Sequence, residues 1–251
     1  MIKFENEDIV GFDHAIRGMR NPMNSWDKSD SLLVPVNTTD GEGNVTEFEY
    51  KIGEADHDLM MKLRNAGTDH RKYMRMITVY VDITAPLYWW KEFDTYKVGT
   101  VANSCSTMHK IHAKEFVLSD FSYESLMSDN VKKDVNKYIH FCSPVLPIGV
   151  LEMVIAELNF CRDKYLETKE KIWFDRMIQL LPSSYNQRRT VMLNYEVLAN
   201  MYKSRKNHKL QEWRDLCEWI KTLPYSEIIT GLDWTHPEHA EDSSGSTMPE
   251  V

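Results

Sequence analysis

Residues 180–216 read LLPSSYNQRRTVMLNYEVLANMYKSRKNHKLQEWRDL, and this stretch decides the fold. From about Thr190 onward its apolar side chains recur with the period of an α-helix. One stripe of this pattern consists of Val191, Tyr195, Leu198 and Tyr202. The pattern predicts helices near 187–205 and 207–222.

Two polar residues of this stretch, Asn194 and Arg205, fall three helical turns apart inside the apolar stripe. A buried polar group without a partner costs about 1–3 kcal/mol, so each side chain needs protein groups or a ligand that is anionic or carries an amide. Alternatively, Arg205 at the end of the helix extends into solvent and caps the last carbonyl groups. Periodicity favours this second interpretation and leaves both open.

A second informative stretch is ITAPLYWWKEFDTYKVGTVANSCS at 83–106. The segment Met74–Ile83 alternates and is rich in β-branched residues, which predicts a strand. Pro86 suits the first turn of a helix that runs to about Lys97, and the polar segment 99–107 reads as a loop. Aromatic rings followed by hydroxyl and amide groups suit a flat ligand with phosphate oxygens. Aromatic residues at helical spacing are, however, more often part of a protein core.

The remaining segments predict a mixture of helices and extended pieces. The expected elements are a helix over Glu7–Arg20, a hairpin of Leu32–Val36 with Val45–Ile52 around a turn at 40–44, a helix over Asp56–Asn65 closed by Gly67, and helices near 120–140 and 147–180. The predicted class is α+β, with helices in the majority.

Charge and composition exclude several classes of protein. The net charge is −8, but residues 232–251 hold five acids and no lysine or arginine, so the rest of the chain carries about −3. This near-neutral body argues against duplex nucleic acid as a partner, while a local basic pocket for one small anion is compatible with it. No apolar run approaches the roughly 18 residues of a membrane span, and the N-terminus does not resemble a secretory leader. We expect a cytoplasmic protein with a disordered acidic tail.

Familiar catalytic and metal-binding signatures are missing from the sequence. It contains no phosphate-binding glycine loop, no dinucleotide fingerprint, no nucleophile elbow and no H-E-x-x-H. His109 and His112 are spaced to share a metal ion on a helix, but no third ligand accompanies them, so we predict no metal site. The four cysteines are scattered and suggest reduced thiols.

The two quoted stretches resemble the flavin-dependent thymidylate synthase family. Residues 83–106 are similar to the family's segment in which a strand passes through Ala-Pro into an aromatic helix that ends in R-H-R-x-x-S-x-N-E-x-S. Residues 180–216 are similar to its L-L-P-x-x-x-Y-x-R segment, followed by Asn, Asn and Arg on one helix and then His, Gln and Trp. MMKLRNAGTDHRKYMRMITVYV at 60–81 is similar to its helix, glycine, S-P-L-E-H and strand.

The resemblance covers roughly residues 56–109 and 178–222. It implies a fold of helices around a mixed β-sheet. This fold would form a single domain over 1–231, with 110–175 as a divergent helical region, and would assemble as a homotetramer. The resemblance also implies an activity in which FAD takes a hydride from NADPH and a one-carbon unit passes from methylenetetrahydrofolate to a pyrimidine nucleotide such as dUMP. No cysteine is required as a nucleophile.

The resemblance assigns roles to individual residues of the second half. Asn194 and Asn200 match asparagines that contact the flavin, and His208 matches a histidine on the cofactor side if one residue is inserted after it. Arg205 matches an arginine that contacts the pyrimidine nucleotide and serves catalysis there. Arg188 falls where a substrate-binding arginine follows Leu-Pro.

The signature motif of the first half differs from the family's pattern. Its R-H-R-x-x-S becomes Thr95-Tyr96-Lys97-Val98-Gly99-Thr100, which leaves Lys97 and Thr100 as donors to the cofactor. A gap of one residue brings Asn103 to a cofactor position and Ser106 to a substrate position. Tyr96 or His109 is the candidate for proton movement. Glu92 replaces a glutamine beside the nucleotide phosphate, and Arg176 lies near a missing arginine at Ile178.

Two functional hypotheses follow from this comparison of motifs. The first is a divergent flavoenzyme that transfers a methyl group to a pyrimidine nucleotide. The second is a non-catalytic nucleotide-binding or scaffold protein that keeps the fold. Loss of guanidinium groups that would bind phosphate motivates the second, because a dianionic phosphate normally attracts such groups.

Overall fold

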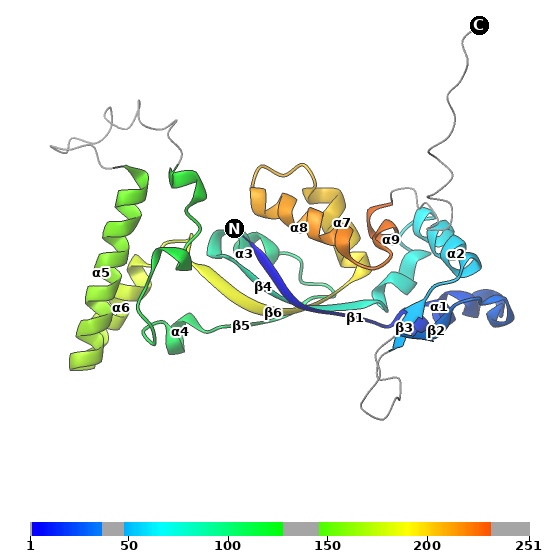
Figure 1. Cartoon of the computed structure of the whole chain (residues 1–251), viewed down its shortest axis with the longest axis horizontal. Coiled ribbons are helices and arrows are strands. Elements are labelled where there is room, and N and C mark those ends of the chain that lie inside the picture. The colour runs from blue at the N-terminus through cyan, green and yellow to red at the C-terminus, as the bar shows by residue number, and fades with distance from the viewer. Residues whose placement is uncertain (1, 37–47, 128–145, 232–251) are drawn as a thin grey trace, which may run out of the picture. The chain divides into compact units, whose positions relative to one another are not determined.

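The computed structural model of the chain describes residues 2–36, 48–127 and 146–231 (Figure 1). The predicted turn at 40–44, part of the helix predicted near 120–140, and the acidic tail lie outside the described residues. The chain divides into two compact units, which we describe separately. Unit 1 comprises Met1–Asp8 and Val79–Leu193, and unit 2 comprises Ile9–Thr78 and Asn194–Val251.

A four-stranded sheet with the strand order β1-β4-β6-β5 accounts for most of the extended structure. Its strands are β1 (Lys3–Val10), β4 (Thr78–Pro86), β5 (Val101–Ser104) and β6 (Asn186–Asn194). β5 and β6 are antiparallel, with Asn103 opposite Thr190 and Ser104 opposite Arg189. β5 lies wholly within the segment 99–107, so the prediction of a loop there is wrong over residues 101–104, all four of which are exposed.

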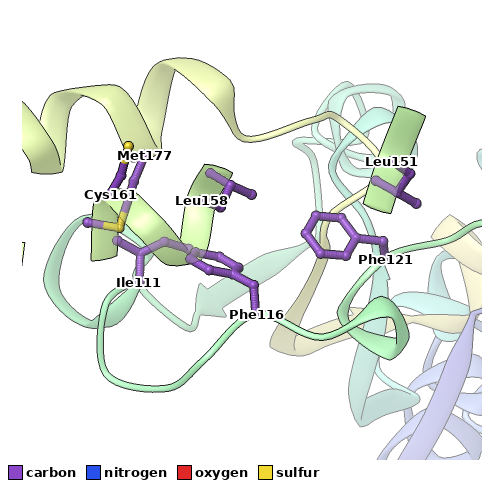
Figure 2. Close-up of a cluster of buried hydrophobic side chains, with 7 residues drawn as sticks. All are labelled: Ile111, Phe116, Phe121, Leu151, Leu158, Cys161 and Met177. Atoms are coloured by element: carbon purple, nitrogen blue, oxygen red, sulfur yellow. The ribbon is translucent and has the colours of Figure 1, made fainter. Parts of the chain in front are cut away.

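The α-helices in the described part of unit 1 are α3 (Leu87–Phe93), α4 (Thr107–Lys110), α5 (Pro147–Thr168) and α6 (Lys171–Leu180). Helices α5 and α6 pack against each other around a cluster of buried residues. Figure 2 shows its members, which are Ile111, Phe116, Phe121, Leu151, Leu158, Cys161 and Met177. The predicted helical segment 147–180 is therefore two helices, and Lys169 in a left-handed conformation (φ 59°) separates them.

Unit 2 contains α1 (Phe12–Arg20), the hairpin of β2 (Leu32–Pro35) with β3 (Phe48–Lys51), α2 (Glu54–Asn65), the 3₁₀ turn η3 (Arg71–Arg75), α7 (Tyr195–Arg205), α8 (Gln211–Thr222) and α9 (Ser226–Thr230). α7 packs against α8, α9 and η3, and six of its first eight residues are apolar or aromatic. The buried ring of Tyr195 meets Phe12 edge-on at 5.7 Å between centroids. This contact joins α7 to α1.

A buried ion pair fixes α1 to α2 within unit 2. Arg20 Nε donates to Asp56 Oδ1 at 2.6 Å, and both side chains are almost fully buried. The other carboxylate oxygen accepts the hydroxyls of Ser29 and Ser31 at 2.7 Å and two backbone N–H groups at 3.1 Å. Burial alone would raise the pKa of Asp56, but the hydrogen bonds from the serines and the arginine outweigh it and hold the pKa below its usual value.

Several predicted elements are confirmed. The hairpin has Leu33 opposite Tyr50, and the helix over 54–65 ends just before Gly67, whose φ is 112°. The class is α+β with helices in the majority, as predicted. Among the described helices, none combines the length and apolar content that crossing a membrane requires.

The predicted helix over Glu7–Arg20 is wrong in its first part. The strand β1 continues to Val10, and the helix starts at Phe12. Gly11 separates them with a φ of 97°, and a Cβ at this position would lie 2.2 Å from the carbonyl oxygen of Met76. A residue with a side chain fits neither that conformation nor that space, so the chain breaks here.

The helix predicted from 187 is also wrong in its first part, because residues 186–194 form β6 and the helix begins at Tyr195. The strand predicted over Met74–Ile83 begins at Thr78 and runs to Pro86, after the turn η3. The following helix ends at Phe93, short of the predicted Lys97. Residues 118–120 and 124–127 form 3₁₀ turns in the segment that was predicted as an α-helix.

Leu158 lies at the centre of the cluster between α5 and α6, with no exposed surface. Replacing it with alanine should lower the free energy of unfolding by about 2–5 kcal/mol, because the lost side chain leaves a cavity. Leu166→Ala, on the same helix and 38% exposed, should cost less than about 1.5 kcal/mol. Urea denaturation measures both, and equal losses would contradict the position of the cluster.

Asp56→Asn should lower the free energy of unfolding at pH 7 by about 3–5 kcal/mol, since Arg20 keeps a buried charge without its counter-ion. Folding lowers the pKa of Asp56 below its ordinary value of 3.8. The ionised carboxylate therefore stabilises the native protein fully above pH 3.8, and this contribution is lost as the pH falls through the pKa of Asp56 in the folded protein. The difference between the two proteins should therefore narrow in acid. Asp58→Asn, exposed on the same helix, is the control. Urea denaturation at several pH values would refute the prediction if the difference stayed constant.

Candidate functional site

A polar hollow of about 250 Å³ lies in unit 1, between the end of α3, the turn after it and strands β5 and β6. Its walls are formed by Phe93, Asp94, Tyr96, Lys97, Thr100, Ala102 and Arg189. Three of these, Tyr96, Lys97 and Thr100, are site residues that the sequence predicted. The fold therefore brings these three together with an arginine, Arg189, that the sequence analysis did not single out.

Arg189 is held rigidly on the inner face of β6. Its Nη1 donates to Asp94 Oδ1 at 2.7 Å and its Nε to Gln187 Oε1 at 3.0 Å. The guanidinium carbon lies 4.2 Å from the centre of the buried Trp90 ring, a distance at which cation and aromatic ring attract. Arg189 thus presents a planar group in a fixed direction at the wall of the hollow.

Lys97 supplies a second positive charge beside this fixed one. Its side chain is exposed and forms no ion pair within the described residues. The hydroxyl of Thr100 donates to the carbonyl oxygen of Tyr96, which closes the turn between α3 and β5. The hollow therefore offers two cations and one carboxylate, an arrangement suited to a small anion.

Arg188 points to a different group of side chains, also within unit 1. Its Nη2 donates to Asp82 Oδ2 at 2.6 Å, and its Nη1 lies 3.6 Å from Glu5 Oε2. Hydrogen bonds from Thr190, then from Arg188 and Asn6, lower the pKa of Asp82 well below its usual range. Two carboxylates thus balance the charge of Arg188 in this structure.

Ser106 and His109 form a local pair at the start of α4. Ser106 Oγ lies 2.8 Å from His109 Nδ1 and accepts the backbone N–H of His109 at 3.2 Å. Ser106 is therefore the N-cap of this short helix, and both side chains are exposed. His112 instead packs against Tyr165 and Phe174. Among the described residues, no group of three or more His, Cys, Asp or Glu side chains is arranged to hold a metal ion.

The other predicted residues of unit 1 lie on three different elements. Asn103 is exposed on β5, opposite Thr190. Glu92 is half-buried on α3, and its carbonyl oxygen accepts the hydroxyl of Thr95. Arg176 lies on α6, where its guanidinium stacks on the ring of Trp173 at 4.6 Å. None of these three residues is part of the hollow's lining.

In unit 2, Asn194 occupies the junction of β6 and α7. Its side-chain oxygen accepts the backbone N–H of Val197 at 3.0 Å, so Asn194 caps the first turn of α7. This position explains why an asparagine ends a strand and starts a helix without an intervening loop. Asn194 and Arg205 lie at opposite ends of α7, about 16 Å apart along the helix axis at 1.5 Å per residue.

Glu196, in the first turn of α7, forms ion pairs with two arginines of the turn η3. Arg71 Nε lies 3.4 Å from Glu196 Oε1, and Arg75 Nε donates to Oε2. Arg71 Nη2 also donates to Asn200 Oδ1 at 3.1 Å, which fixes the amide of Asn200. Burial would raise the pKa of Glu196, but hydrogen bonds and charges from both arginines leave it below its usual value.

The end of α7 meets α8 around the buried ring of Trp213. The guanidinium carbon of Arg205 lies 4.4 Å from the centre of that ring, and the ring of His208 meets it at 6.1 Å. Nδ1 of His208 accepts the backbone N–H of Leu210 at 3.2 Å. Arg205 is half-buried and stacked on an aromatic ring. It is therefore neither fully buried nor extended into solvent, the two positions considered from the sequence.

Each unit therefore collects part of the predicted set of residues. Unit 1 joins Tyr96, Lys97 and Thr100, and unit 2 joins Arg205 with His208. The sequence analysis did not single out Arg71, Arg75, Arg189, Gln187 and Glu196. One signal for Arg189 was available, because a strand over 186–194 places alternate residues on one face. The arginine pair with Glu196 had no such local signal.

Comparisons with known proteins find likeness in structure and none in sequence. No protein-family model matches the chain. No curated protein matches it significantly. The following likenesses therefore rest on the fold.

Two solved structures align with nearly the whole chain. Thymidylate synthase X (ThyX) from Helicobacter pylori, solved with FAD and dUMP, aligns with a TM-score of 0.58 and 18% identity over 91% of this chain and 96% of that one. The UMP/dUMP methylase PolB from Streptomyces cacaoi, bound with 5-Br dUMP, aligns with a TM-score of 0.54 and 14% identity over 92% and 95%. The protein therefore has the fold of the flavin-dependent thymidylate synthases, as its sequence motifs predicted.

Proposed function

We propose that this chain binds FAD and a pyrimidine nucleotide such as dUMP, and takes part in flavin-dependent transfer of a methyl group to the base. The observation that carries the proposal is the hollow with Lys97 and Arg189. The hollow lies at residues 95–100, which correspond to the family's R-H-R-x-x-S motif but contain no arginine. Lys97 and Arg189 therefore place two cations at the segment expected to contact phosphate. The fold that the chain shares with ThyX, solved with FAD and dUMP, supports it.

The hollow fits part of a cofactor. Its volume of about 250 Å³ is below the roughly 300–1,000 Å³ of pockets that bury a drug-sized ligand, so it suits one or two phosphate groups. Lys97 would contribute charge, and Arg189 would contribute the N–H groups that Gln187 and Asp94 do not use. The hydroxyl of Thr100 lies in the same wall. Asn103 on β5 would extend this cofactor-binding segment.

The residues of α7 suit the flat rings of the two ligands. Asn194 and Asn200 carry amides whose oxygens accept hydrogen bonds within the protein and whose NH₂ groups would donate to the polar edge of an isoalloxazine ring. His208 would belong to the same cofactor side. Bound FAD would supply the carrier for a hydride from NADPH, with methylenetetrahydrofolate as the carbon donor. This chain's own groups would bind and orient these molecules.

Arg205, whose guanidinium stacks on the ring of Trp213, would orient the nucleotide and so assist catalysis. Arg188, Ser106, Arg176 and Glu92 are the further substrate-binding candidates. Of these, Arg188 would have to exchange a carboxylate partner for the nucleotide. Tyr96 or His109 would move a proton. A homotetramer in the cytoplasm, acting in nucleotide biosynthesis, completes the proposal.

A specific observation favours the alternative of a non-catalytic nucleotide-binding or scaffold protein. Carboxylates neutralise the arginines of both units, with Asp82 and Glu5 on Arg188, and Glu196 on Arg71 and Arg75. An anionic ligand must compete with these internal partners. A protein that binds the nucleotide but oxidises no NADPH would fit this alternative.

The visible spectrum of the purified protein tests the proposal directly. We expect FAD, added and then freed of excess by gel filtration, to stay with the protein and to show a shifted flavin absorption band. NADPH added with dUMP should bleach this band, because the bound flavin is reduced. Free FAD carried through the same column is the control. A protein that stays colourless after gel filtration, with no FAD bound, would contradict the proposal.

Lys97→Gln should weaken binding of FAD about tenfold, which is the effect of losing roughly one charge-assisted contact. Lys91→Gln removes an exposed lysine of the adjacent helix α3, outside the hollow, and should leave the affinity unchanged. Absorbance titration measures both variants. Equal affinities for the two would remove the hollow from the proposed site.

A further inference from the structure

A larger cavity, of about 440 Å³, lies in unit 2 and shares no residue with the candidate functional site. Its lining comes from α1, β3 and the segment around the 3₁₀ turn at 26–28. The lining residues are Asp13, Ile16, Arg17, Arg20, Trp26, Ser29 and Tyr50. This volume falls within the range of pockets that hold small organic ligands.

A buried arginine forms one wall of the cavity. The side chain of Arg20 is 5% exposed, and its Nε and Nη1 donate to Asp56 and to the carbonyl oxygen of Ser25. Within the described residues, no hydrogen bond is recorded from the remaining terminal nitrogen, Nη2. Arg20 therefore brings an incompletely used donor to the cavity wall.

The contact between Arg20 and its counter-ion leaves other N–H groups of the guanidinium unused. Asp56 pairs with Arg20 through a single N–H, rather than through the two parallel bonds of a fork. Four other donors, two hydroxyls and two backbone N–H groups, share the second oxygen of the carboxylate. An anion in the cavity would thus meet a guanidinium that is fixed in place and able to donate.

Two aromatic rings and two rim charges complete the cavity. Trp26 is 49% exposed, and its indole N–H donates to Asn21 Oδ1 at 2.9 Å, which fixes one edge of the ring. Tyr50 is half-buried. At the rim, Arg17 is exposed with no ion pair among the described residues, and Asp13 offers an acceptor. The lining therefore combines flat apolar surface with two cations and one acid.

We propose that this cavity binds a planar heteroaromatic ring carrying one anionic group, at most the size of a mononucleotide. The ring lies against Trp26 and Tyr50, where stacking stabilises it. The anionic group accepts from Arg20 Nη2 and from Arg17. A ring N–H or amino group donates to Asp13. Such ligands include nucleoside monophosphates and heteroaromatic carboxylates, and they would bind independently of the proposed flavin site.

Isothermal titration calorimetry on the full chain tests the proposal with four probes. Uridine 5′-monophosphate and orotate carry both ring and anion, uridine carries the ring alone, and ribose 5-phosphate the anion alone. We expect at least one of the first two to bind at least tenfold more tightly than uridine and ribose 5-phosphate, because each of these lacks one contact. Whichever of the first two binds identifies the source of the anion. No binding by either would overturn the proposal.

Variants assign the binding to this cavity. Arg17→Gln should weaken it about tenfold through one lost charge-assisted contact, and Trp26→Ala by at least as much, while Trp26→Phe keeps a ring and most of the affinity. Arg17 is exposed, so its replacement leaves the fold intact, and circular dichroism checks this. Lys28→Gln, on the same 3₁₀ turn as Trp26, and Lys97→Gln, in the hollow of unit 1, should leave the affinity unchanged. Binding that survives Arg17→Gln and Trp26→Ala, or that Lys97→Gln abolishes, would overturn the proposal.

Discussion

The buried amide of Gln187 holds the hollow of unit 1 together. Its backbone oxygen accepts the indole N–H of Trp90, its side-chain nitrogen donates to the carbonyl oxygen of Cys105, and its side-chain oxygen accepts from Arg189. One residue thus ties α3, the end of β5 and β6 to each other. Because its side-chain amide makes hydrogen bonds through both of its ends, burying it carries little penalty. The direction of the Arg189 guanidinium, and with it the wall of the hollow, depends on this amide.

The same residues explain why β6 was mistaken for a helix. The inner face of this strand carries Gln187, Arg189, Val191 and Leu193, and two of these four are polar. Apolar and polar residues therefore do not alternate along the strand, although buried and exposed positions do. The apolar residues that follow belong to α7 and impose a helical period that extends back to Val191. Because paired polar groups fill half of the inner positions, the strand lacks the alternation of apolar and polar residues by which a strand is recognised.

Local patterns predicted the parts of the fold that depend on neighbours in sequence. The helix before Gly67, the hairpin and the order of the three motifs all follow from spacing within short segments. Lys97 and Thr100 fell together in the hollow for the same reason, since the turn after α3 places them there. Pairs such as Arg71 with Glu196 join segments more than 100 residues apart, and one sequence carries no record of such contacts. The arginines that the fold neutralises were therefore indistinguishable from those left to a ligand.

This distinction matters for the proposed phosphate contact. Arg188 is balanced by Asp82, Arg71 and Arg75 share Glu196, and Arg189 shares its charge with Asp94. In the described part of the hollow, Lys97 is the cation without an internal carboxylate. A lysine attracts phosphate as a point charge and sets no orientation, whereas a guanidinium fork does. Lys97 would thus set the affinity for phosphate, while Arg189 would set the orientation of the phosphate. Because Gln187 holds both Arg189 and Trp90 of α3, that orientation also depends on how α3 packs on the sheet.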